Sequence, residues 1–181
     1  EAAACARALR KYGLTRWLRG DDAGAMDIYR RASVLREAMT PYELARLDTQ
    51  VGSYYAWRRS PEPVNLLAEA RVRCASIPDE RWRKRAMAET HFWMGVSYMR
   101  GAAGSLSPHL AQLTRVELQT ARDLAMEISW ERLELYAERW LAMLYVEIGC
   151  LNEAQDLINL GIERSQRHYR DSRLAAGYHY A

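Results

Sequence analysis

The feature that most constrains this fold is a short pattern that returns about every forty residues along the chain. The pattern is a small residue followed three positions later by Tyr. Its full copies are Gly52-Ser53-Tyr54-Tyr55, Gly95-Val96-Ser97-Tyr98, Ala142-Met143-Leu144-Tyr145 and Gly177-Tyr178-His179-Tyr180, and Gly13-Leu14-Thr15-Arg16 is a degenerate first copy. A small residue midway along a helix lets a second helix approach closely, and a Tyr one turn later packs beside it. A repeat of this length predicts stacked helical hairpins.

Helix-start and helix-stop signals lie between these copies. Arg19-Gly20-Asp21-Asp22 ends one helix and caps the next, while Thr40-Pro41-Tyr42-Glu43 combines an N-cap, a Pro at the first helical position and a Glu that closes a capping box. Similar signals are Ser60-Pro61, Pro78-Asp79, Ser107-Pro108, the loop at 101–105 and Gly149. Apolar residues recur every three or four positions between them, and no stretch alternates with period two. We therefore expect an all-α fold: one domain over 1–181, with hairpins at about 2–38, 41–76, 79–127 and 129–168 and a lone helix over 171–181.

Composition narrows the class of protein further. The net charge of +3 is too balanced for a nucleic-acid grip by bulk electrostatics, and no apolar run approaches the roughly 20 residues of a membrane span. Three widely spaced cysteines favour free thiols in a reducing cytoplasm. The expected last helix carries Leu174, Ala175 and Tyr178 without a partner helix, so we expect the chain to be part of a longer protein and this end to favour self-association.

The sequence has no motif that predicts catalysis. The four histidines form no i, i+4 pair, and a nucleophile elbow, a phosphate-cradling loop and a dinucleotide fingerprint are absent, so we expect no enzyme, no metal and no cofactor. The densest basic run is Arg81-Trp82-Arg83-Lys84-Arg85. It is either a docking patch for phosphate or an acidic partner, or a solvated helix face, which the nearly neutral net charge favours.

The recurring residues resemble the tetratricopeptide repeat. The best copies run through Leu141, Ala142, Tyr145, Gly149, Ala154, Ile158 and Gly161, and through Gly13, Gly20, Ala25, Tyr29 and Ala32. The stretch from Thr120 to Ile128 is similar to the longer, roughly forty-residue variant of bacterial signalling ATPases and MalT-like LuxR-family regulators. This resemblance implies a right-handed α-solenoid of about four hairpins, although Pro61 and Pro63 replace the usual Gly turn.

The resemblance also implies a ligand groove. In tetratricopeptide arrays, a stripe beside the small residue of each first helix lines the concave face. The matching residues are Arg10, Leu14, Trp17, Arg46, Thr49, Ser53, Trp57, Phe92, Val96, Met99, Tyr136, Arg139, Met143 and Tyr178. Arginines among large aromatics are the composition of a binding hot spot. Alternatively, several of these residues, above all Phe92, Val96 and Met99, are ordinary core between repeats.

Three functions remain open on this basis. The first is a non-enzymatic regulatory or scaffold domain that binds a protein or peptide in its concave groove, because a stack of hairpins presents a preformed surface. The second is the small-molecule sensor arm of a MalT-like transcription regulator, with an inducer such as a sugar stacked on Trp17, Trp57 or Tyr136 and DNA contacted by another domain. The third is a structural spacer or self-association module.

Overall fold

The computed structural model describes residues 1–58, 63–101 and 106–168, and within these ranges its regular secondary structure is entirely helical. The elements are α1 (Ala2–Leu18), α2 (Asp22–Ser33), the short 3-10 helix η1 (Arg36–Ala38), α3 (Pro41–Trp57), α4 (Pro63–Ala75), α5 (Glu80–Gly101), α6 (Pro108–Glu127), α7 (Glu131–Glu147) and α8 (Leu151–His168). The all-α expectation is confirmed for this part of the chain. The expected helix over 171–181, which includes Tyr178, lies outside the described residues, as do Ser60 and Pro61.

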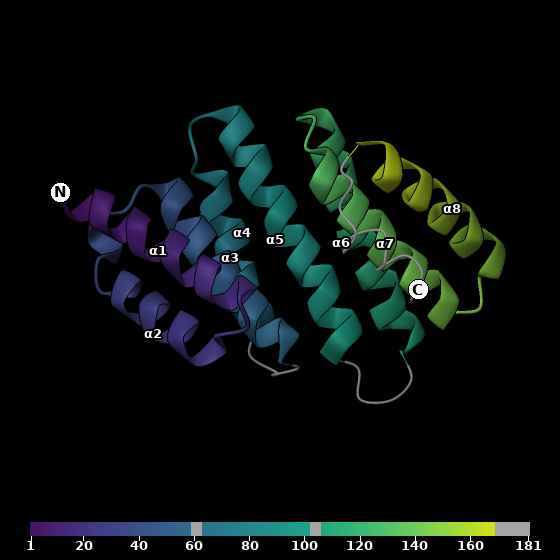
Figure 1. Ribbon diagram of the computed structural model, residues 1–181, viewed down its shortest axis with the longest axis horizontal. Coiled ribbons are helices and arrows are strands. Elements are labelled where there is room, and N and C mark those ends of the chain that lie inside the picture. The colour runs from purple at the N-terminus through teal and green to yellow at the C-terminus, as the bar shows by residue number, and fades with distance from the viewer. Residues whose placement is uncertain (59–62, 102–105, 169–181) are drawn as a thin grey trace.

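Helices that follow one another in the chain lie side by side, from α1 and α2 at the left of Figure 1 to α8 at the right. Successive helices pair as α1 with α2, α3 with α4, α5 with α6 and α7 with α8, although the contact between α6 and α7 is at least as extensive as that between α7 and α8. Between pairs, α3 packs on α5, α4 on α5 and α6 on α7, and smaller contacts join α1 to α3 and α5 to α7. Neighbouring odd-numbered helices therefore touch along the molecule.

The glycines of the recurring pattern lie where paired helices come closest. A Cβ atom placed on Gly13 would lie 2.5 Å from the ring of Tyr29 in α2, and one placed on Gly52 would lie 2.7 Å from Leu67 in α4. A Cβ on Gly95 would lie 2.7 Å from Leu118 in α6. Carbon atoms that are not bonded prefer about 3.5–4.0 Å. The predicted reason for the small residue, a close approach of the partner helix, is therefore confirmed at all three glycines.

Three helices end in the same Schellman geometry. After α1, Gly20 takes a positive φ of 81° and the Asp21 N–H donates to the Arg16 carbonyl. After α7, Gly149 has a φ of 79°, and the Cys150 N–H donates to the Tyr145 carbonyl. After α6, the equivalent position is Ser129 with a φ of 54°, although this conformation favours glycine. The sequence signals at Gly20 and Gly149 are confirmed, whereas the third stop carries no glycine.

The predicted N-caps hold, with one correction. The side chains of Asp21, Thr40 and Ser107 accept hydrogen bonds from backbone N–H groups three positions on. The expected capping box at Thr40 is only half formed, because the Glu43 N–H donates to Thr40 Oγ1 while the Glu43 carboxylate accepts a 2.8 Å hydrogen bond from Arg10 Nε in α1. That carboxylate links two helices rather than closing the first turn of its own.

Candidate binding site

Most polar residues of the expected groove stripe lie in contacts between helices. Arg10 is only 4% exposed and donates to Glu43 in α3. The Thr49 hydroxyl is 2.8 Å from that of Thr90, which joins α3 to α5, and the buried Ser53 hydroxyl donates to a backbone carbonyl of its own helix. Arg10 and Thr49 thus join neighbouring helices, and all three side chains use hydrogen-bonding capacity inside the protein.

The apolar members of the stripe are also engaged. Phe92 and Val96 are buried in the core around α5, α6 and α7, and Met99, Tyr136 and Met143 pack against that core. Trp17 lies 5.6 Å from Trp93, measured between ring centroids. Leu14 and Arg139 are half-buried, and Tyr178 lies outside the described residues. Burial at Phe92 and Val96 agrees with the alternative that these positions are core between repeats.

Trp57 and Arg46 differ from the rest of the stripe. Trp57, the last residue of α3, is exposed, and the Arg100 guanidinium stacks 4.3 Å from its ring. Arg46 donates to the Tyr42 hydroxyl and pairs with Glu89 at 2.9 Å. Burial alone would lower the pKa of Arg46, but the charge of Glu89 and the contact with Tyr42 raise it above its ordinary value. Arg46 is thus a fixed positive charge between α3 and α5.

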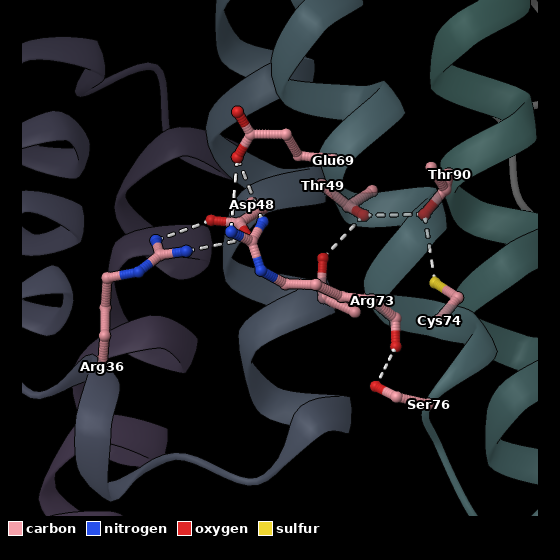
Figure 2. Close-up of polar contacts among 9 residues, drawn as sticks. Arg36, Asp48, Thr49, Glu69, Arg73, Cys74, Ser76 and Thr90 are labelled. Carbon is pink, nitrogen blue, oxygen red and sulfur yellow. Dashed lines mark hydrogen bonds and ion pairs between the residues drawn. The ribbon is translucent and has the colours of Figure 1, made fainter.

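A partly buried polar network links α3 to α4 and α5 (Figure 2). The Asp48 carboxylate accepts from Arg36 of η1 and from Arg73 of α4. Burial raises the pKa of the neighbouring Cys74 thiol to about 11. A thiol with that pKa is almost entirely protonated at neutral pH and is a poor nucleophile. The Asp48 contacts join α3 to η1 and α4, and the hydroxyl contact between Thr49 and Thr90 joins α3 to α5.

A cleft of about 630 Å³ lies between α1 and the first turns of α3 and α5. We call it the α1–α3–α5 cleft. Its lining residues are Arg7, Arg10, Lys11, Thr40, Pro41, Tyr42, Glu43, Arg46, Ile77, Pro78, Asp79, Trp82 and Arg85. Of the expected groove residues, it includes Arg10 and Arg46. The cleft thus lies at one end of the expected stripe.

Positive charge exceeds negative charge around this cleft. Five cationic side chains line it against two carboxylates, and a third carboxylate, Glu89, which is not part of the lining, pairs with Arg46. Glu43 is shared between Arg7, at 3.3 Å, and Arg10, at 2.8 Å. The lining can attract an anionic group, because charges in a partly enclosed site are screened less than charges on an open surface.

Aromatic rings form the other part of the lining. The rings of Tyr42 and Trp82 lie 5.1 Å apart, and Trp82 remains 46% exposed. The Arg85 guanidinium stacks 4.1 Å from the ring of Trp130 and lies 5.9 Å from that of Trp82. Trp82 and Arg85 face the same space because they are three positions apart on one helix. Such rings offer an apolar surface beside the cations.

The basic run at 81–85 is the sequence feature that pointed to a docking patch in this region, although none of its residues belongs to the expected groove stripe. The helical period divides the run between two faces. Lys84 pairs with Glu80 and Glu127, and Arg81 is exposed away from the cleft, while Trp82 and Arg85 line it. The sequence marks Tyr42 only as part of a helix start. Its place in the site depends on the neighbouring helix, which a local pattern does not specify.

Comparison of the chain with models of protein families, with curated proteins and with solved structures finds no significant match. Among residues 1–58, 63–101 and 106–168, no group of three or more His, Cys, Asp or Glu side chains is placed to hold a metal ion. None of the helices in these ranges has both the length and the apolar character to cross a membrane.

Proposed function

We propose that this chain is a non-enzymatic helical-repeat domain of the tetratricopeptide type, in which four hairpins stack as a right-handed solenoid and bind a segment of a partner protein. The recurrence of one packing arrangement supports the repeat. Gly13, Gly52 and Gly95 occupy equivalent places in three successive helix pairs, and each receives one large side chain of the following helix. The free thiols of Cys5, Cys74 and Cys150 support a reducing compartment such as the cytoplasm.

The α1–α3–α5 cleft is the observation that carries the binding function. Its walls are helices held by buried contacts, such as Arg10 with Glu43, so a ligand would meet a preformed surface at little ordering cost. Arg beside Trp and Tyr is the composition that dominates binding energy in protein interfaces.

A random peptide display library tests this function. Selection on the purified chain is expected to enrich peptides that, once synthesised, bind in isothermal titration calorimetry with a defined stoichiometry. Trp82→Ala, in the cleft, is expected to weaken them, whereas Trp57→Ala, an exposed tryptophan that does not line the cleft, serves as the matched control. Failure of every enriched peptide to bind in calorimetry would reject the protein-binding function.

The same cleft also supports the second function, an inducer-sensing arm of a MalT-like regulator. Its volume of about 630 Å³ lies within the about 300–1,000 Å³ typical of small-molecule sites, and the half-exposed Trp82 offers a ring for stacking a sugar. Tryptophan fluorescence titrated with a sugar panel tests it. Saturable quenching that disappears in Trp82→Ala favours the sensor, and no response to any sugar rejects sugar sensing.

A further inference from the structure

Two cations of the α1–α3–α5 cleft have no carboxylate partner among the described residues. The single carboxylate of Glu43 is shared by Arg7 and Arg10, and Glu89 pairs with Arg46. Within residues 1–58, 63–101 and 106–168, no carboxylate lies within ion-pair distance of Lys11 or Arg85, although both line the cleft. The other lining carboxylate, Asp79, caps α5 by accepting a hydrogen bond from the backbone N–H of Trp82.

Arg85 is the better placed of the two for binding an anion. Arg85 is half-buried, and its guanidinium carbon lies over the ring of Trp130, 4.1 Å from the ring centroid, so this contact restricts the side chain. A guanidinium that contacts a ring can still donate N–H groups to a planar anion such as a carboxylate, and no carboxylate among the described residues pairs with Arg85. A side chain fixed in this way loses less rotamer entropy on binding than a free surface arginine does.

The aromatic pair beside Arg85 adds a second requirement for the ligand. Trp82 is 46% exposed, and the ring of Tyr42 lies 5.1 Å away. This apolar surface suits a hydrophobic side chain next to the anionic one. Cations and an exposed aromatic ring in one open cleft suit a peptide segment that carries an anionic side chain next to an apolar one. A lone ion would use only the cations.

We propose that the α1–α3–α5 cleft binds an acidic peptide segment of a partner protein, in which an Asp or Glu carboxylate pairs with Arg85 and Lys11 and a neighbouring apolar side chain packs on Trp82. This proposal rests on the protein-binding function above and specifies the chemistry of its ligand. Lys11 and Arg85, which have no carboxylate partner among the described residues, are complementary in charge to a carboxylate-rich segment. The cleft therefore suits an acidic peptide.

Fluorescence anisotropy with short labelled peptides of equal length tests the proposal. One peptide combines Glu and Leu, the second replaces each Glu with Gln, and the third replaces each Glu with phosphoserine. The full chain is expected to bind the Glu peptide at least roughly tenfold more tightly than the Gln peptide, the difference that a charge-assisted hydrogen bond provides. The affinity is expected to fall as salt rises. Preference for the phosphoserine peptide, together with competition by millimolar inorganic phosphate, would overturn the proposal in favour of a phosphate site.

Matched variants separate the cleft from general electrostatics. Arg85→Gln is expected to weaken the Glu peptide by about tenfold, while Arg81→Gln, the same charge change on an exposed residue of the same helix outside the cleft, is expected to change it by less than about twofold. Lys11→Gln, on an exposed side chain whose replacement cannot disturb the core, gives an independent loss. Equal losses in Arg81→Gln and Arg85→Gln, or none in Arg85→Gln and Lys11→Gln, would reject the proposal. Library-selected peptides that bind all three variants like the original chain would reject it too, yet leave the protein-binding function intact.

Discussion

Replacement of Gly52 by Ala tests whether helix pairs are held by close backbone approach. Gly52 lies in the middle of α3, and a Cβ there would sit 2.7 Å from both Cγ and Cδ2 of Leu67. Leu67 is fully buried in α4, so its side chain cannot swing into solvent to make room. The added methyl group therefore forces α3 and α4 apart or Leu67 out of its preferred rotamer.

Two effects of opposite sign set the magnitude. Ala is more favourable than Gly inside a helix by about 0.5–1 kcal/mol. Overpacking a core contact costs about 1–3 kcal/mol. The overpacking cost outweighs the helix gain, so we expect Gly52→Ala to lower the free energy of unfolding by about 0.5–2 kcal/mol. For a domain of this size, each kcal/mol corresponds to about 2–4 °C in Tm.

Urea denaturation followed by far-ultraviolet circular dichroism measures the change, with Gly101→Ala as the control. Gly101 is exposed at the end of α5, and a Cβ there meets nothing within 4 Å, so this variant should be neutral or slightly stabilised. In a Leu67→Ala background, the penalty of Gly52→Ala should disappear, since the clashing atoms are gone. A Gly52→Ala chain as stable as the original, or one with the same penalty in both backgrounds, would refute the close-approach argument.

Three further changes have expected outcomes in unfolding experiments. Ala142→Trp, at a fully buried position of α7, should lower the free energy of unfolding by about 1–3 kcal/mol, and thermal unfolding equal to that of the original would show that Ala142 is not at a helix contact. Ser129→Gly should raise it by about 0.5–1 kcal/mol, because φ is 54° there, and a loss in urea denaturation would contradict this. A hydrogen bond from the Gly24 N–H, together with Arg16, lowers the pKa of Asp21 below its ordinary 3.8, so its stabilising effect is present above that pH and is lost as the pH falls through the lowered pKa. Asp21→Asn, which keeps the cap, should therefore flatten the acid limb of a stability-against-pH curve, and an unchanged limb would contradict the assignment.

Local sequence patterns predicted the local features of this fold well. Helix ends depend on a few adjacent residues. The helix end at Gly20 and the N-caps at Asp21, Thr40 and Ser107 could therefore be predicted from the local sequence alone. Ser129 shows the limit of this approach. Its positive φ follows from the same chain reversal that the glycines make, but serine gives no sign of it.

The expected groove shows a different limit. Helical periodicity identifies which residues share a face, but it does not say which neighbouring helix covers that face. The stripe of α3 is partly covered because α5 packs on it, so that the Thr49 and Thr90 hydroxyls meet at 2.8 Å. In the same way, Glu43 reads as a capping-box residue until Arg10, 33 positions earlier, is brought to its carboxylate.

The buried polar contacts also explain why the cleft has a defined shape. Arg10 with Glu43 fixes α1 on α3, and Arg46 with Glu89 fixes α3 on α5. A shift in the register of two helices would separate such a pair and leave an uncompensated charge inside the protein. Each pair therefore favours one register of the two helices. That register places Tyr42 of α3 against Trp82 of α5. Arg10 and Arg46, which the sequence predicts as ligand contacts, therefore have a structural role as well. They set the distances between α1, α3 and α5, the helices that line the cleft.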